Sequence, residues 1–356
     1  MRVCFHHDGV EWSGSARAFA EAARALAARG YDVTMACGEG TDVERRWRSA
    51  DLDVIPLPAG GSRWRSAWGL RRVLSRRFVE VVFVHSEREQ LVAATAVRLA
   101  GRGAVVRRVP PYGHLTLRGE ATLAGRLAAT GFLFAFADDL RAAKPPSRAL
   151  EPVVAPPAVE ISRSALPPAR TDQAGTIACL FGAPPHARVA ATLRMMALLV
   201  ERHPSLRLAL VGPRADDDAL RLQAAALGIG GAVTRSVDPS ERADLLERSA
   251  IAFVLADGDD AAYGLLDCFA AGVPVVALRD PLTTRFVTDG ENGLLTSTLD
   301  APAQAARIAA LLADGPRLTR LARGARDAGH RWPESAMADG FERAAAAARD
   351  RTRWRV

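Results

Sequence analysis

The sequence predicts an α/β protein with two doubly wound domains that face a central cleft. Short apolar runs alternate with amphipathic stretches from end to end, a pattern typical of βα units and parallel sheets. The 356 residues are more than one ordinary core holds and suit two domains. Prolines cluster between residues 152 and 168, and the polar stretch that follows predicts a linker.

In the first domain, we expect a strand at Val3–Phe5 and a helix at Ser15–Ala28, which Gly30 ends. Two further helices are expected, at Ala67–Arg77 and Gln90–Leu99. The remaining strands expected in this domain are Tyr31–Ala36, Val54–Leu57, Glu80–Val84, Ala104–Arg108, Phe132–Phe136 and Val153–Ala155.

A second alternating series begins after the linker. Its expected strands are Thr176–Phe181, Leu206–Val211, Ala232–Arg235, Ala250–Leu255 and Pro274–Ala277, each with a neighbouring helix. Three helices are expected at the end of the chain, at Ala301–Ala313, Arg317–Asp327 and Ser335–Arg349. The predicted domains are therefore residues 1–165 and 166–334, with a C-terminal helix within 335–356 that packs back on the first domain.

Composition limits the location of the protein. No apolar run approaches the roughly 20 residues that span a bilayer, and the start of the chain has no apolar signal region. We therefore expect a cytoplasmic protein. The four cysteines (Cys4, Cys37, Cys179 and Cys268) show no metal-like spacing and are expected to be buried thiols.

The net charge of +7 suits an anionic partner: a phosphorylated substrate, a membrane surface or a nucleic acid. Arginine and tryptophan alternate at Arg45–Arg48 and Arg63–Arg65, which favours peripheral binding to an anionic membrane. A solvated arginine face on a helix explains the pattern equally well. Nucleic acid is not expected, since no recognised binding module is present.

The loop Glu11–Ser15 precedes the first helix. Ser13 or Ser15 can cap that helix, and Gly14 lets the backbone approach an anionic ligand at the helix N-terminus. The alternative is an ordinary capped helix start. The loop lacks the G-x-G-x-x-G pattern, so a dinucleotide site, and with it a dehydrogenase, is not indicated.

The stretch Asp257–Pro274 is more specific. We expect it to run from a strand through an acidic loop into a short helix and a second strand. Asp259 is expected in the loop and Asp267 in the helix. The amides of Gly264, Leu265 and Leu266 are expected at the positive end of the helix, where a phosphate binds favourably.

These motifs resemble those of the retaining glycosyltransferases of family 4. That family carries two glutamates separated by seven residues, then a small-residue run that ends Gly-x-Pro-Val-Val, and here Asp259, Asp267 and Phe269–Val276 match it. Asp289–Leu295 (DGENGLL) resembles a further family stretch. The resemblance covers nearly the whole chain and implies the GT-B fold, two Rossmann-like domains with the acceptor on the first and the nucleotide-sugar donor on the second.

The resemblance also implies roles for single residues. Asp259 would contact the donor sugar and is the catalytic candidate, and Asp267 would hold the nucleotide ribose. Gly212 and Arg235 would flank the base. Gly14 and the Gly264–Leu266 amides would contact the diphosphate or the sugar. The family needs no metal, because basic residues and helix ends stabilise the departing diphosphate.

Several positions depart from the family pattern. Both acids are aspartates, each shorter than glutamate by one C–C bond of about 1.5 Å. The family's diphosphate cations should fall near Phe181–Gly182, which holds no arginine, and near Arg188. Arg285 could supply the missing charge. The family's loop histidine is displaced to His114, the second catalytic candidate.

The resemblance thus implies a hexosyltransferase-like enzyme that moves a sugar from a nucleotide-sugar donor to an unknown acceptor, with net retention and no cofactor. A lipid-linked molecule is one candidate for the acceptor. Glycoconjugate, polysaccharide or secondary-metabolite biosynthesis would use such a reaction. Two alternatives stay open. One is a sugar-nucleotide epimerase or hydrolase on the same fold. The other is a catalytically silent, glycosyltransferase-like binding partner, which the missing cations suggest.

Overall fold

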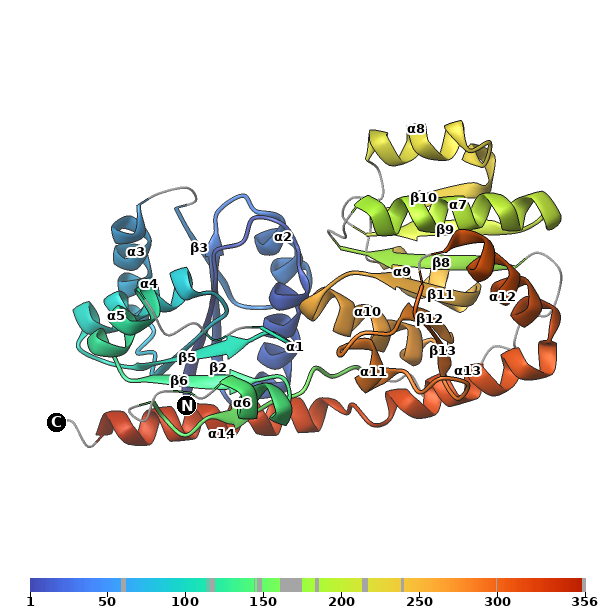
Figure 1. Ribbon diagram of the computed structural model, residues 1–356. Helices are drawn as coiled ribbons and strands as arrows, with labels where there is room; N and C mark the ends of the chain where they lie inside the picture. Colours follow the sequence, from blue (N-terminus) through green and yellow to red (C-terminus); the bar gives the residue numbers. More distant parts are fainter. Residues whose placement is uncertain are drawn as a thin grey trace. The chain divides into compact units, whose positions relative to one another are not determined.

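The computed structural model describes residues 1–58, 62–113, 115, 119–143, 145, 149–160, 175–182, 186–212, 217–237, 240–298 and 300–353. The chain forms two compact units, the first from residues 1–158 and 334–356 and the second from residues 159–333 (Figure 1). The sequence placed the boundary later, at 165/166. Ala158 is still buried in the core of the first unit, and the division follows it directly.

The first unit is a parallel sheet with helices on both faces (Figure 1). Within the described residues the strand order is β3-β2-β1-β4-β5-β6-β7. Its elements are β1 Arg2–His7, α1 Gly14–Ala28, β2 Asp32–Gly38, α2 Asp42–Ser49, β3 Val54–Leu57, α3 Arg63–Arg76, β4 Val81–Val84, α4 Glu87–Ala100, β5 Ala104–Val109, α5 Glu120–Leu127, β6 Thr130–Phe134, α6 Ala137–Ala143, β7 Val153–Val154 and α14 Glu334–Arg353.

Alternate residues of each central strand enter different cores, as the two-residue period of a strand requires. Val3 and Phe5 of β1 pack with α1, α2 and α14, whereas Cys4 between them packs with α3, α4 and α5. Both sheet faces are therefore covered, which explains the nearly continuous apolar runs of these strands.

The second unit repeats this plan. Its parallel sheet has the order β10-β9-β8-β11-β12-β13 among the described residues. Its elements are β8 Thr176–Phe181, α7 His186–Arg202, β9 Arg207–Val211, α8 Asp218–Ala226, the 3₁₀ turn Gly230–Ala232, β10 Val233–Ser236, α9 Ser240–Glu247, β11 Ser249–Leu255, α10 Gly258–Ala270, β12 Val275–Leu278, α11 Thr283–Phe286, β13 Gly293–Thr296, α12 Ala301–Ala313 and α13 Gly315–Gly329.

Helix α14 completes the first unit from the far end of the chain. Phe341 is fully buried, with its ring 5.1 Å from that of Phe83 and 5.8 Å from that of Phe5. Gly340 lets the helix approach β7 closely, because a Cβ there would lie 2.6 Å from the carbonyl oxygen of Val154. Arg29 pairs with Asp339 and Glu342 at 2.7 Å each.

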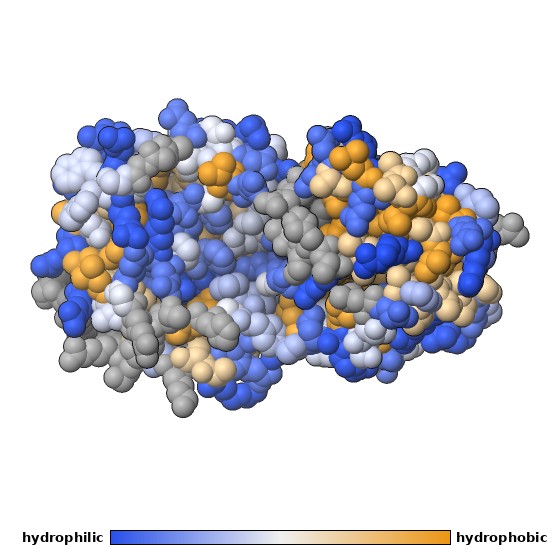
Figure 2. All heavy atoms as spheres, turned by 45° about the horizontal axis from the view of Figure 1, so that its top comes forward, coloured by the Kyte–Doolittle hydropathy of each residue, from blue (hydrophilic) through white to orange (hydrophobic). Residues whose placement is uncertain are grey.

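The cysteine prediction is confirmed, since all four thiols are buried and free. Burial raises the pKa of Cys4, Cys37 and Cys179 to about 12 each. On the face drawn in Figure 2, hydrophilic side chains dominate, and hydrophobic atoms form separate areas on both units. None of the helices in the described ranges is long and apolar enough to cross a bilayer.

Candidate functional site

The strand order of the second unit locates a site. The direction in which successive parallel strands are added to the sheet reverses between β8 and β11, because β9 and β10 lie on one side of this pair and β12 and β13 on the other. In open parallel sheets, ligands bind at the carboxyl ends of the strands at such a switch point. Gly182 follows β8 and Asp257 follows β11, so these two residues flank the switch point.

An ion pair joins the two helices that start at this edge. Nη1 of Arg188, in the first turn of α7, lies 3.1 Å from Oδ1 of Asp257, the N-cap residue of α10. The Asp257 side chain makes no capping hydrogen bond. Arg188, predicted to contact the donor, therefore lies at the switch point with its charge engaged by a carboxylate.

Asp259 lies in the first turn of α10 and not in a loop as predicted, because the helix already begins at Gly258. Its side chain is buried, at 6% exposure. A carboxylate at this position is favoured by the partial positive charge of the helix N-terminus. Asp260 follows it, and a Cβ on Gly182 would lie 3.3 Å from the Cβ of Asp260. The backbone of Gly182 therefore approaches this turn closely.

Asp267 lies two turns further along α10, at a rise of about 12 Å and a rotation of about 80° from Asp259. Its Oδ2 accepts a hydrogen bond of 2.9 Å from Nη1 of Arg242 in α9. The two side chains are 12% and 22% exposed, so this ion pair is largely shielded from solvent. Sequence reasoning missed Arg242, since nothing local to α9 points to a residue in α10.

The expectation for Gly264, Leu265 and Leu266 is wrong in its geometry. These residues lie in the middle of α10, where each amide is used within the helix. A Cβ on Gly264 would lie 3.1 Å from Val254 of β11, so this glycine lets the helix pack on the sheet. Leu265 and Leu266 are fully buried. The amides at the positive end belong to Gly258, Asp259 and Asp260.

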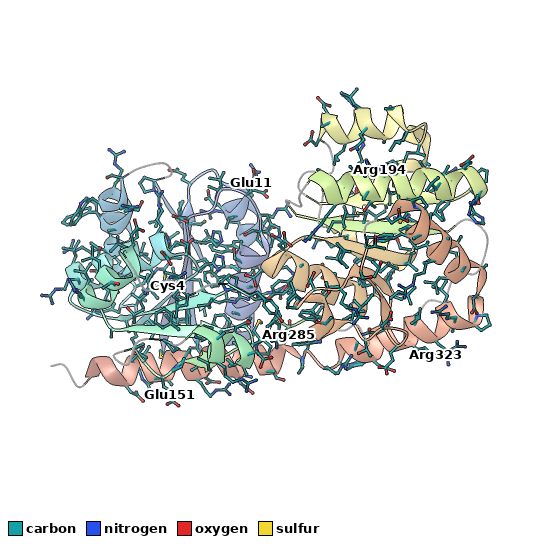
Figure 3. The ribbon with its side chains drawn as sticks, in the orientation of Figure 1. Cys4, Glu11, Glu151, Arg194, Arg285 and Arg323 are labelled. Atoms are coloured by element: carbon teal, nitrogen blue, oxygen red, sulfur yellow. The ribbon has the colours of Figure 1, made fainter. Side chains whose placement is uncertain are left out.

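Gly212 and Arg235 lie on neighbouring strand ends. The amide of Gly212, after β9, donates to the carbonyl oxygen of Ser236 at 3.0 Å, and Arg235 of β10 pairs in register with Leu210 of β9. Arg235 is exposed. Arg285 lies in α11, after β12, and is half-buried (Figure 3). All three residues are thus on the carboxyl side of the sheet.

The stretch Asp289–Leu295 has a structural role. Asn292 is buried, accepts from the amide of Thr288 at 2.7 Å and donates to the carbonyl oxygen of Phe286 at 2.8 Å. Oδ1 of Asp289 accepts from the amide of Leu295 at 2.8 Å. These bonds hold the turn before β13. A Cβ on Gly293 would lie 2.3 Å from the carbonyl oxygen of Val275, so glycine is required there.

In the first unit, Gly14 is the first residue of α1, and Ser13 caps the helix by accepting from the amide of Ala16 at 3.4 Å. Gly14 is buried. The catalytic candidate His114 lies outside the described residues. His85, which follows β4, stacks on His7 with ring centroids 6.1 Å apart and the planes 7° from parallel.

A buried carboxylate joins the ends of β1 and β4. Glu89 accepts from the amides of Asp8 at 2.9 Å, His85 at 2.6 Å and Ser86 at 3.1 Å. Burial opposes its ionisation, but nearby His7, His6 and His85 hold its pKa at about 2. Burial and the charge of Glu89 raise the pKa of Asp8 to about 7, although Arg88 lies 3.1 Å away.

A candidate metal centre does not emerge. Across the parts of the chain that the structure describes, no group of three or more His, Cys, Asp or Glu side chains is arranged to hold a metal ion.

The family comparisons assign both units. The model of the glycosyl transferase 4-like domain matches residues 13–150, and the model of the glycosyl transferases group 1 matches residues 177–328. A D-inositol 3-phosphate glycosyltransferase from Stackebrandtia nassauensis is 35% identical over 162 residues, which cover 44% of this chain and 37% of that protein. The lipopolysaccharide core biosynthesis glycosyltransferase LpsE of Rhizobium meliloti is 31% identical over 123 residues, 35% and 36% of the two chains. The chain thus spans little more than a third of these relatives' length.

Solved structures share the fold over nearly their whole length. Anabaena Alr3699/HepE, in complex with UDP and glucose, matches with a TM-score of 0.75 and 15% identity over 96% of this chain and 98% of that one. Sucrose-phosphate synthase from Thermosynechococcus elongatus matches with a TM-score of 0.73 and 16% identity, at 96% and 98% coverage. At such low identity the likeness bears on the fold, and it confirms the predicted pair of parallel-sheet α/β domains of GT-B type.

Proposed function

Since both units of this chain belong to the glycosyl transferases, the first 4-like and the second of group 1, we propose that it transfers a sugar from a nucleotide-sugar donor to an acceptor. The observation that carries the proposal is the arrangement at the β8/β11 switch point. Asp259 and Asp267 lie on one helix there, and their separation of about 12 Å suits two parts of one extended ligand.

The donor would lie along α10. The Oδ1 of Asp267 would accept hydrogen bonds from the ribose hydroxyls while Arg242 holds Oδ2. Asp259 would accept from a hydroxyl of the sugar. The diphosphate would lie near Arg188, Arg285 and the N-terminus of α10, where a negative charge is stabilised. Gly212 and Arg235 would border the base.

The reaction follows from these placements. The bond from the anomeric carbon to the diphosphate breaks, an acceptor oxygen forms the new bond, and the acceptor proton leaves with the nucleoside diphosphate. We propose net retention, a hexose as the sugar and an acceptor site on the first unit. We also propose that basic side chains and the α10 terminus carry the diphosphate charge. Activity should then survive removal of divalent ions with a chelator.

A thermal-shift panel tests the donor site. UDP, GDP, TDP and ADP are added singly, and a nucleotide at about 100 times its dissociation constant should raise the stability by roughly 2.7 kcal/mol. If none of them shifts the melting temperature, the proposal fails. Donor consumption with and without acceptor then separates a transferase from an epimerase or hydrolase, which turns over its donor alone.

A silent binding protein is the second candidate. It is favoured by the acidic surroundings of the α10 N-terminus, where Asp257 engages Arg188. The family resemblance also implies a cation near Phe181–Gly182, where this sequence has no arginine. Such a protein would bind a nucleotide in the panel and would form no product with any acceptor.

We further propose a location at the inner membrane surface, with a lipid-linked acceptor. The basic character of the chain supports it, with a net charge of +7.

A further inference from the structure

The two arginine-tryptophan stretches of the sequence have different environments. In α2, Trp47 is fully buried and its Nε1 donates to the carbonyl oxygen of Ala16 at 3.1 Å. The arginines of that helix pair with acids of the same helix, Arg45 and Arg46 with Asp42 and Arg48 with Glu44. In α2 the guanidinium groups are therefore engaged by acids of their own helix, and Trp47 offers no exposed ring to a membrane.

Helix α3 is different. Trp64 is 70% exposed and Trp68 is 47% exposed. They are four residues apart and so lie on one face of the helix. Arg65, Arg72 and Arg76 are also exposed, and among the described residues they form no ion pair. No acidic residue occurs between Ser62 and Arg77.

The buried side of α3 fixes this orientation. Ala67, Leu70, Val73 and Leu74 pack into the core with α4 and α5, so the tryptophans must face outward. The guanidinium of Arg71 lies 4.8 Å from the Trp68 ring centroid and holds that ring in place.

An ion pair links the start of α3 to the start of α5. Arg63 forms an ion pair with Glu120, the first residue of α5. Leu123, one turn further along α5, is 47% exposed. We call Trp64, Arg65, Trp68, Arg72, Arg76 and Leu123 the α3 surface.

We infer that the α3 surface docks on a membrane of anionic phospholipid. Tryptophan rings favour the membrane–water interface, and arginine guanidinium groups bind lipid phosphates while their stems cover apolar surface. An exposed leucine gains by burial among acyl chains and gains nothing from a nucleic-acid backbone. This inference deepens the membrane location proposed above and names its surface, and it can be tested without any sugar transfer.

Sedimentation of the full chain with vesicles tests it. The protein should bind vesicles of phosphatidylcholine mixed with phosphatidylglycerol and should not bind phosphatidylcholine alone. The triple variant R65Q/R72Q/R76Q should bind the mixed vesicles on the order of 100-fold more weakly. The variant W64S/W68S, which keeps every charge, should bind roughly tenfold more weakly.

The matched control is R45Q/R46Q/R48Q on α2, which changes the net charge by the same amount. It should keep vesicle binding near the wild-type level. Equal losses in the α2 and α3 triple variants would overturn the inference, because the total charge would then explain the binding. The inference would also be overturned if the wild-type protein did not bind anionic vesicles, or if it bound a DNA duplex and not the vesicles. Circular dichroism and the nucleotide thermal shift report whether each variant is folded.

Discussion

Replacing Arg242 with glutamine should weaken nucleotide binding through Asp267. The ion pair is 22% and 12% exposed, so the carboxylate loses a partner that solvent replaces only in part. Hydrogen bonds to a charged group contribute roughly 1.5–3 kcal/mol. If R242Q lets Asp267 turn away from the ribose, the dissociation constant should rise about 10- to 150-fold.

A double-mutant cycle decides how Arg242 acts. Calorimetry gives the dissociation constants of wild type, R242Q, D267N and R242Q/D267N for the nucleoside diphosphate with the largest thermal shift. If Arg242 works by holding Asp267, R242Q should add little in the D267N background, and the coupling energy should nearly equal the R242Q effect. A full additive effect would mean that Arg242 contacts the nucleotide itself.

Arg248 provides a matched control for Arg242. Arg248 lies just beyond the end of α9, and its Nε donates to the carbonyl oxygen of Asp244 at 3.0 Å. R248Q should therefore leave nucleotide affinity unchanged. If folded R242Q binds the nucleotide as tightly as wild type does, the positioning role of Arg242 is refuted. The 2′,3′-dideoxy nucleotide adds a second readout, since R242Q should lose the preference for the ribose hydroxyls.

Three further predictions concern stability and accessibility. The folded-state pKa of Asp8 is about 7, above its usual value, so its ionisation opposes folding as pH rises. D8N should therefore raise the free energy of unfolding by about 1 kcal/mol at pH 8, a value reduced because Asp8 is partly exposed to solvent. The gain should be much smaller near pH 4. Equal gains in urea titrations at the two pH values would contradict this prediction. Gly340→Ala should lower the melting temperature because its Cβ meets β7, whereas Gly125→Ala, which meets nothing within 4 Å, should not. Iodoacetamide should label no cysteine in the native protein and all four after unfolding, as counted by mass spectrometry. Fast labelling of the folded chain would contradict this, since it would mean that at least one thiol is accessible.

The strands could be predicted because their apolar runs are set by burial on both sheet faces. The predicted strand Thr176–Phe181 coincides with β8, and the predicted helix Ala301–Ala313 coincides with α12. The predicted start of α10 is wrong, because Gly264 lies in the middle of the helix and Gly258 begins it. Gly264 lets the helix pack closely on Val254 of β11. This is a tertiary contact, which a local sequence pattern does not reveal.

The sequence predicts which side chains gather at the carboxyl edge of the second sheet better than it predicts their contacts. Asp259 and Asp267 could be located by their spacing, but the pairing of Asp267 with Arg242 depends on how α9 meets α10. The two arginine-tryptophan stretches are also alike in local composition.

One signal in the sequence separates them. Asp42 stands three and four residues before Arg45 and Arg46, and Glu44 stands four before Arg48, whereas α3 contains no acidic residue.

Helix α14 has a consequence for the order of events during synthesis. The core of the first unit needs Met337, Phe341 and Ala345, whereas the second unit is one continuous stretch, residues 159–333. A chain emerging from the ribosome can therefore complete the later unit first. The sheet that contains its first residues must wait, with an open apolar groove, until the last helix is released. A released chain truncated before residue 334 would therefore keep a second unit that can fold, beside a first unit that is a target for chaperones and proteases.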